Sequence, residues 1–310
     1  MKYKTAYIYA SMFFVVFLIF SFLIGLFFYN NINALKQGAV IDRQSIASVT
    51  ATAVKVKISH LVDVASLMAS NNNVITDIAD GKWENAASVI RDLQNNINYY
   101  DTYIDRIVLI DPKGIERAAY PELVGGIGAD FSSSSYFQKL SSGAPYAISN
   151  VILRASRPQI NVINLLVPVS NNGKILGVIG LQLPTDGFLE FSNDVLLGTY
   201  GYTYIVDSAG NIVASPKFSF ETNIINVAST PVVHEVLSGN SGYYDSYNDV
   251  NDERSFIAYT PVPLYGWGVI LQEPYNEVFG SANNILLGVE IKLFLFVVLD
   301  AILTCLIFLW

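Results

Sequence analysis

The sequence has little cysteine, histidine or positive charge, and each shortage excludes a class of protein. Cys305 is the only cysteine in 310 residues, so a disulfide framework and a cysteine-based zinc site are excluded. Two histidines, His60 and His234, leave little for histidine catalysis or metal binding. The net charge of −8 disfavours nucleic acid as a partner, because no broad basic face could neutralise a phosphate backbone.

Common catalytic motifs are also missing. The sequence contains no G-x-S-x-G, no H-E-x-x-H and no P-loop. The glycine-rich stretch Gly125-Gly-Ile-Gly128 lacks the lysine and Ser/Thr of a Walker A motif and the spacing of a dinucleotide fingerprint. We therefore expect a protein that is not an enzyme, with no catalytic residue, no metal and no cofactor.

The sequence does contain two long apolar runs. The mean hydropathy is +0.40, high for a soluble protein, and two runs concentrate the excess. Tyr7 to Tyr29 is uncharged and long enough to cross ~30 Å of hydrocarbon as a helix. A cleaved signal peptide is the alternative, but the run ends in bulky residues, which favours an uncleaved anchor. Lys2 and Lys4 precede the run and place residues 1–6 in the cytoplasm.

A second run lies in the last helical segment, residues 275–310. It predicts a second span over about 286–310, with an apolar core at Leu293–Trp310. Asp300 lies inside this core, where an acid costs about 2.5–3.5 kcal/mol unless protonated or partnered. It is either an interhelical contact in a dimer or a tolerated acid facing the bundle. Two spans predict a cell-membrane protein with residues 30–284 extracytoplasmic.

Residues 30–100 predict a stalk of helices. No proline occurs between Asn30 and Ser70, and apolar residues recur there at helical spacing. Asn71-Asn-Asn73 ends this helix, and shorter helices follow over 74–79 and 83–95. The apolar stripe of the long helix comprises Val54, Ile58, Leu61, Val62, Ala65 and Met68.

The stretch from 105 to 183 is repeated about 95 residues later. Asp111-Pro-Lys-Gly114 and Asp207-Ser-Ala-Gly210 are the same D-x-x-G turn, in which Asp bonds forward to backbone and Gly supplies a positive φ. Three further landmarks recur in the same order: Leu140–Gly143 with Leu237–Gly239, Leu165–Val169 with Ala258–Val262, and Gly177–Ile179 with Gly268–Ile270. The sequence thus predicts two copies of one α/β module, at 101–195 and 196–274.

Each module is expected to form an antiparallel sheet with a short helix. In the first we expect strands at 107–110, 115–120, 144–149, 159–169 and 175–183, a helix at 133–140 and a connecting helix at 185–194. In the second we expect strands at 202–206, 212–214, 242–246, 255–261 and 268–272 and a helix at 231–237. The fold class is therefore α+β: a long N-terminal helix and two tandem PAS-like sheet modules, flanked by two transmembrane helices.

This arrangement resembles the double Cache sensor family over about residues 30–283. The resemblance is carried by DFSSSSYFQKLSSGAPYAIS, GYTYIVDSAGNIVASP and AYTPVPLYGWGVILQEP, in that order. It implies a small extracellular ligand in the membrane-distal module, residues 101–195. The amino-acid-binding subgroup uses an arginine, a tryptophan, a tyrosine and an aspartate there, at positions that align with Ser134, Tyr136, Phe137 and Gln182. Because the arginine and aspartate are missing, we do not expect this chain to bind amino acids as that subgroup does.

Other polar residues of this module could replace the missing charges. Arg154 and Arg157 precede the strand that carries Gln159 and Asn161 on one face and Asn164 on the other. The alternative is that Arg157 forms a surface ion pair while Gln159 and Asn161 bond local backbone. The predicted ligand-binding set is Ser134, Tyr136, Phe137, Tyr146, Arg157, Gln159, Asn161 and Gln182.

The leading hypothesis is the sensor region of a homodimeric transmembrane receptor. It would bind a small organic solute of the amino-acid, carboxylate or amine class. The signal would pass through the second span to a cytoplasmic output domain absent from this chain, such as a kinase, a methyl-accepting coil or a cyclic-dinucleotide enzyme. The alternative is a membrane-tethered binding or interaction protein without an output domain of its own.

Overall fold

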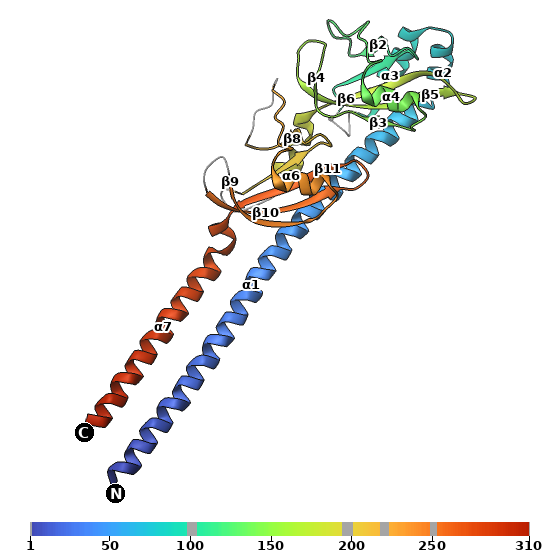
Figure 1. The fold of residues 1–310 in the computed structure, drawn as a ribbon. Coiled ribbons are helices and arrows are strands. Elements are labelled where there is room, and N and C mark those ends of the chain that lie inside the picture. The colour runs from blue at the N-terminus through green and yellow to red at the C-terminus, as the bar shows by residue number, and fades with distance from the viewer. Residues whose placement is uncertain (1, 98–103, 194–200, 218–222, 249–252, 310) are drawn as a thin grey trace. The chain divides into compact units, whose positions relative to one another are not determined.

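The computed structural model describes residues 2–97, 104–193, 201–217, 223–248 and 253–309 (Figure 1). The chain forms two compact units. One comprises Met1–Arg43, Asp245–Phe256 and Glu273–Trp310, and the other Gln44–Tyr244 and Ile257–Gln272. The predicted module boundaries at 100/101 and 195/196 lie outside the described residues and stay predictions.

Three helices precede the first strand: α1 (Lys2–Ala69), α2 (Asn72–Ala79) and α3 (Trp83–Ile97). The predicted break falls where expected, because the Asn71 side chain caps α2 by accepting hydrogen bonds from the amides of Asn73 and Val74. The predicted stripe of α1 is buried apart from Val62, which is partly buried. α1 is thus one continuous helix whose C-terminal part packs along a single apolar face.

The first sheet has six strands in the order β2-β1-β6-β5-β3, with β4 also paired to β5. The strands are β1 (Arg106–Ile110), β2 (Glu116–Tyr120), β3 (Ala147–Ile148), β4 (Ile152–Leu153), β5 (Asn161–Asn171) and β6 (Lys174–Pro184). The helix α4 (Ser135–Ser141) lies between β2 and β3 in the chain. β1, β5 and β6 pair antiparallel, as predicted, and the short β4 was not predicted.

The second sheet has five strands in the order β8-β7-β11-β10-β9. The strands are β7 (Tyr202–Val206), β8 (Ile212–Ala214), β9 (Gly242–Asn248), β10 (Glu253–Val262) and β11 (Trp267–Pro274). Helix α6 (Pro231–Leu237) occupies the place that α4 has in the first module, and the order of the paired strands corresponds. Between the modules lie η1 (Thr185–Phe188) and α5 (Glu190–Asn193), in place of the continuous helix predicted over 185–194, whose last residue is not described. The two-sheet α+β fold is confirmed.

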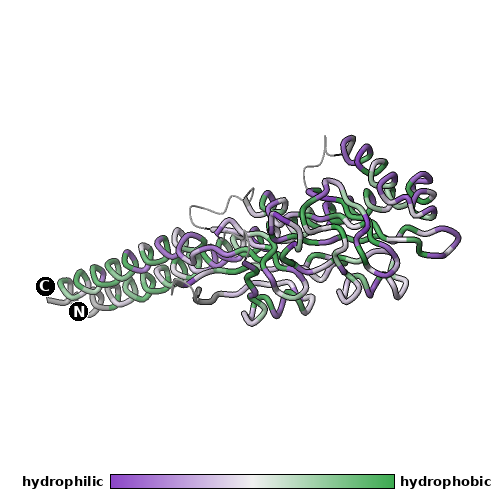
Figure 2. Tube along the Cα trace, turned by 90° about the horizontal axis from the view of Figure 1, so that it is seen from above, coloured by the Kyte–Doolittle hydropathy of each residue, from purple (hydrophilic) through white to green (hydrophobic). Residues whose placement is uncertain are grey.

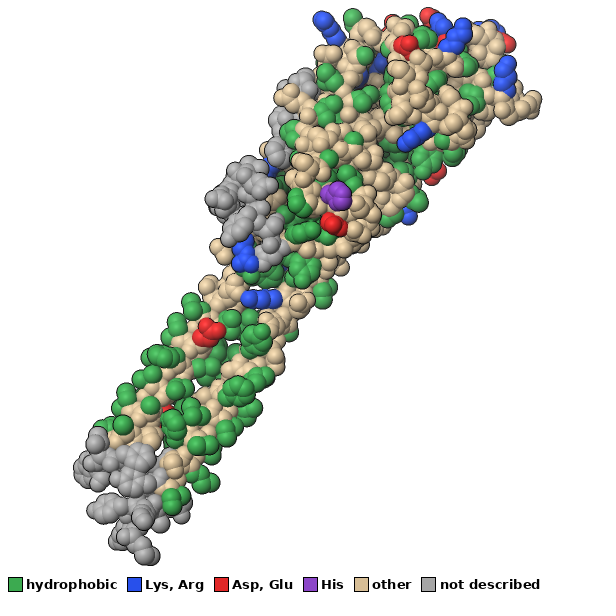
Figure 3. Space-filling view, in the orientation of Figure 1, with side chains coloured by type: hydrophobic (Ala, Val, Ile, Leu, Met, Phe, Trp, Pro, Cys, Tyr) green, Lys and Arg blue, Asp and Glu red, His purple; other side chains and the backbone are tan. Residues whose placement is uncertain are grey.

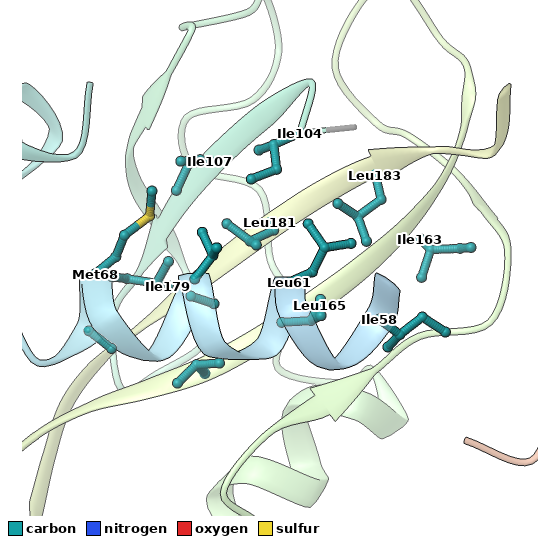
Figure 4. Close-up of a cluster of buried hydrophobic side chains, with 14 of the residues drawn as sticks. Ile58, Leu61, Met68, Ile104, Ile107, Ile163, Leu165, Ile179, Leu181 and Leu183 are labelled. Carbon is teal, nitrogen blue, oxygen red and sulfur yellow. The ribbon is translucent and has the colours of Figure 1, made fainter. Parts of the chain in front are cut away.

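The two faces of the first sheet pack against different partners. Alternate residues such as Ile107 and Leu181 join the core formed with α1, where Leu61 is fully buried (Figure 4). Their neighbours, such as Val108 and Val178, join a smaller core with α4. This separation follows from the two-residue period of a strand, and it decides which side chains can share a site.

Both D-x-x-G turns have the predicted chemistry. Asp111 Oδ1 accepts hydrogen bonds from the amides of Lys113 and Ile115, at 2.8 and 3.0 Å. Asp207 Oδ1 accepts from Ala209 and Asn211 at 2.8 and 2.9 Å. The turn glycines have φ of +91° in the first module and +78° in the second. The same turn therefore starts both sheets.

We expect Gly210→Ala to destabilise the second module more than Gly239→Ala. Both glycines have positive φ, which costs an alanine about 1–2 kcal/mol. A Cβ at Gly210 would also lie 2.6 Å from the Cβ and 2.8 Å from the Cα of Ala228, whereas one at Gly239 meets nothing within 4 Å. Overpacking should add about 1 kcal/mol or more at Gly210. Urea unfolding of the two variants checks this, and equal losses would contradict the close approach seen at Gly210.

One helix among the described residues is long and apolar enough to cross a membrane, the part of α1 from Ser11 to Ala69. Figure 2 shows green, hydrophobic colouring along much of the two helices that lead to the chain termini. On the face drawn in Figure 3, hydrophobic side chains are exposed along both long helices. The second predicted span lies in α7 (Tyr275–Leu309) and stays a prediction.

Asp300, the acid inside that second predicted span, is 5% exposed. Its Oδ2 has no hydrogen-bond partner among the described residues. The side chain therefore lies inside the unit formed by the two chain ends, rather than on its surface. A contact of Asp300 across a dimer stays a prediction.

Candidate functional site

The candidate site lies on the α4 face of the first sheet. Tyr136 and Phe137, on the first turn of α4, are 8% and 6% exposed and pack on β1, β5 and β6. Ser134 precedes the helix and donates from Oγ to the carbonyl of Phe131, at 2.6 Å. The aromatic pair predicted for the site thus lies over the sheet, and its contact with a ligand stays a prediction.

A row of three buried polar residues crosses the sheet on this face. Arg106 on β1 lies opposite Gln182 on β6, and Gln182 lies opposite Asn164 on β5. Their exposed fractions are 1%, 3% and 1%. Burial of three such groups is costly unless each finds hydrogen-bond partners, so the row is a specific feature rather than ordinary core packing.

The two carboxamides of the row have unused hydrogen-bonding capacity. Asn164 donates from Nδ2 to the Tyr136 hydroxyl at 3.2 Å, which ties the row to α4. Asn164 Oδ1 and Gln182 Oε1 are buried and have no hydrogen-bond partner among the described residues. Since a buried acceptor without a donor costs about 1–3 kcal/mol, a solute that donates to these oxygens would be stabilised here.

The charged member of the row is already neutralised. Arg106 donates from Nη2 to Glu116 Oε1 at 2.5 Å and from Nε to the carbonyl of Pro121 at 3.1 Å. Both side chains of this ion pair are 1% exposed. Burial raises the pKa of the Glu116 carboxyl, against the opposing effect of the Arg106 guanidinium. The backbone of Gly126 lies directly against the pair and leaves no room for a side chain.

The second module carries a related polar pair whose two members bond each other. Tyr202 and Gln272 stand opposite each other on β7 and β11, as Arg106 and Gln182 do on β1 and β6. Here the Tyr202 hydroxyl donates to Gln272 Oε1 at 2.9 Å. Burial raises the pKa of Tyr202 to about 12, so the hydroxyl stays protonated as the donor. The glutamine oxygen thus has an internal donor in the second copy, whereas in the first copy the described residues supply none.

Four of the predicted site residues lie elsewhere. Arg157 and Gln159 are exposed, before β5 begins. Asn161 donates from Nδ2 to the carbonyl of Asn223, at 3.0 Å. Tyr146 packs with the core on the α1 side, its ring 6.4 Å from that of Tyr265. Of the polar residues of this strand, Asn164 and not Gln159 or Asn161 therefore contacts the aromatic residues of α4.

The reason is the way the two faces of β5 are directed. Odd-numbered residues of this strand, such as Ile163 and Leu165, face α1, so the even-numbered Asn164 faces α4. Arg106 was missed because the first strand was expected to begin at Ile107. Arg154, which could have replaced a missing charge, is buried. It forms an ion pair with Asp105 and donates to the carbonyl of Pro158. The structure thus brings together Tyr136, Phe137 and Gln182 of the predicted set, with Ser134 at the start of α4.

Two cavities lie away from this face. One, of about 390 Å³, lies between α3 and β2 and is lined by charged side chains that include Glu84, Arg91, Arg117 and Glu122. The other, of about 620 Å³, lies between α1 and α7 and is mostly apolar. Neither lining includes Asn164 or Gln182, so these two cavities are separate from the polar row.

Comparison with known proteins identifies the family. The family model dCache_1, described as Cache domain, matches residues 31–282. No curated protein matches the chain. The ligand-binding domain of the Pseudomonas fluorescens chemoreceptor CtaA, in complex with L-isoleucine, has a TM-score of 0.61 at 16% sequence identity, covering 80% of this chain and 98% of that one.

Two further solved structures are similar. The ligand-binding domain of the Pseudomonas aeruginosa chemoreceptor PctB, in complex with L-Gln, has a TM-score of 0.59 at 14% identity, covering 77% of this chain and 92% of that one. The extracellular domain of a putative histidine kinase has a TM-score of 0.61 at 16% identity, with coverages of 77% and 95%. At these identities the likeness establishes the shared fold. Since the family model spans most of the chain, this protein belongs to the Cache domain family, with the two-sheet form of its double Cache members.

Proposed function

We propose that this chain is the extracytoplasmic sensor region of a transmembrane receptor and binds a small polar solute in its first module. The observation that carries the proposal is the pair of buried carboxamides beneath Tyr136, Asn164 and Gln182, whose oxygens have no partner in the part of the chain that the structure describes. Its support is the contrast with the second module, where Gln272 is satisfied by Tyr202. A pair of buried carboxamide oxygens beneath an aromatic side chain suits a solute that donates hydrogen bonds.

This site would recognise its ligand through hydrogen bonds, because it offers no unpaired charged side chain among the described residues. Arg106 and Glu116 neutralise each other, and the row has no other charged member. Relatives of this fold bind L-isoleucine and L-Gln. We propose that this chain instead favours solutes whose N–H or O–H groups contact the two carboxamides. The site acts by binding alone, without catalysis.

The signalling context is part of the same proposal. The apolar part of α1 anchors the N-terminal end in the cell membrane, and α7 returns the chain to it, so that residues 30–284 are extracytoplasmic. Signal would pass through α7 to an output domain, in a homodimer. A ligand shifts signalling only as far as it binds one state of the module better than the other.

A thermal-shift screen of the full chain in detergent tests the ligand claim. The panel comprises L-isoleucine, L-Gln, carboxylates, amines and purines. A true ligand at 100 times its Kd should stabilise the protein by about 2.7 kcal/mol, because it binds only the folded state. Neutral solutes with N–H donors are expected to give the largest shift. A panel in which only zwitterions stabilise the chain would contradict the proposed ligand class.

A further inference from the structure

The Asp207 turn of the second module has a contact that its counterpart in the first module lacks. Asp207 is fully buried, and its Oδ1 accepts the two amides of its own turn. Its Oδ2 accepts a hydrogen bond from the amide of Val151 at 2.7 Å. Val151 belongs to the first module, between β3 and β4. The same Oδ2 also accepts from Asn211 Nδ2 of its own turn, at 2.8 Å. The carboxylate therefore holds its own turn with both oxygens and, through Oδ2, the neighbouring module as well.

The segment that Asp207 holds leads directly to the candidate site. Ser149, two residues before Val151, donates its amide to the carbonyl of Asn164 at 2.8 Å. In return Asn164 donates its own amide to Ser149 Oγ, also at 2.8 Å. Ser149 is 3% exposed, so water does not compete strongly for either bond. The backbone of Asn164 is thus fixed by a residue that the Asp207 turn keeps in place.

A neighbouring contact strengthens the same link. Ser208, the residue after Asp207, has its Oγ 2.8 Å from the side-chain oxygen of Asn150, to which it donates. Two consecutive residues of the second module therefore bond two consecutive residues of the first. All these residues lie in the compact unit formed by Gln44–Tyr244 and Ile257–Gln272.

The first module uses the matching carboxylate differently. Asp111 Oδ1 also accepts two amides of its own turn, but Oδ2 accepts from Arg117 Nε, at 2.7 Å, within the same module. The Arg117 side chain is 45% exposed. In both copies the second carboxylate oxygen of the D-x-x-G turn accepts from a side chain of its own hairpin, Arg117 in the first and Asn211 in the second. Asp207 Oδ2 accepts in addition from Val151 of the other copy.

We infer that Asp207 is a positioning residue for the candidate site: it orders the Ser149–Val151 segment and thereby fixes Asn164. The second module then completes the site of the first. The consequence for a ligand rests on the proposed function. Because coupling between two sites is reciprocal, a solute that contacts Asn164 would also change the Asp207 turn, which leads into β7 and β8.

The substitution Asp207→Asn tests this link, with Asp111→Asn as its matched control. An asparagine keeps Oδ1 for the amides of the turn but places an NH₂ group where Oδ2 accepted from Val151 and from Asn211 Nδ2. Hydrogen exchange of the full chain in detergent, resolved to single amides by mass spectrometry, measures the result. In Asp207→Asn the Val151 amide should exchange roughly tenfold faster or more, as expected for loss of a bond to a charged group. The Asn164 amide should also exchange faster, because the segment that holds its acceptor Ser149 is no longer fixed. In Asp111→Asn both should stay at the wild-type rate.

A second variant keeps the test decisive if Asp207→Asn folds poorly. Ser149→Ala removes the acceptor of the Asn164 amide and leaves the bond between Val151 and Asp207. In this variant the Asn164 amide should exchange faster, while the Val151 amide should keep the wild-type rate. Two results would overturn the inference: a wild-type exchange rate for Asn164 in Asp207→Asn, or equal acceleration in Asp111→Asn. No ligand enters this experiment, so its failure is separate from failure of the solute screen.

Discussion

Replacing Glu116 with alanine is expected to lower the free energy of unfolding by about 3–5 kcal/mol, because it leaves the Arg106 guanidinium buried without its partner. Both side chains are 1% exposed, so water cannot replace the lost carboxylate without opening the fold. Of the three hydrogen bonds that the guanidinium donates, only the one to the Pro121 carbonyl would remain in this variant. Equilibrium urea unfolding of the full chain in detergent measures the loss.

The double variant Arg106→Met/Glu116→Leu should recover most of that loss. Removing both charges also removes the desolvation cost that raises the pKa of the Glu116 carboxyl. The surface pair of Lys82 and Asp80, with side chains 55% and 49% exposed, provides the control, and Lys82→Ala should cost less than about 1 kcal/mol. If Glu116→Ala were as mild as Lys82→Ala, the pair would not be buried as described.

The second large effect is expected at Leu61. Leu61→Ala should destabilise the chain by about 2–5 kcal/mol, since its side chain is fully buried between α1 and the first sheet (Figure 4). Leu67→Ala, on the same helix, is the matched control because Leu67 is 70% exposed. Both changes have the same effect on helix propensity. Unfolding midpoints that shift equally in the two variants would mean that α1 does not pack on the sheet through the predicted stripe.

Most of the fold could be predicted because its signals are local. The D-x-x-G turns specify hairpins through their own side chains and glycines, and Asn71 caps α2 as its position suggested. β7, β8 and α6 begin and end at the predicted residues. The two-residue β4 was not predicted, because its pairing with β5 depends on the tertiary fold and two residues show no periodicity. The predicted helix over 185–194 was replaced by η1 and α5 for a reason that its sequence does not reveal.

The candidate site was predicted less well, since a site depends on which face of each strand meets which helix. Alternation placed Gln159 and Asn161 on one face and Asn164 on the other, but nothing in the sequence said which face α4 covers. Arg106 carries no local signal of burial, because its partner Glu116 is on another strand. The aromatic residues of α4 could be identified because the family resemblance supplied their place. Contacts between the modules, such as that of Asp207 with Val151, could not be foreseen from either copy alone.

Calorimetric binding of the panel compound with the largest thermal shift tests the central claim most directly. Wild type is compared with Gln182→Leu, which removes a buried carboxamide of the row, and with Gln159→Leu, which removes an exposed one. We expect Gln182→Leu to weaken binding by about 10- to 100-fold, as loss of a buried hydrogen bond should. Gln159→Leu should bind as wild type does. Undiminished binding by Gln182→Leu would contradict the placement of the solute on the α4 face of the first sheet.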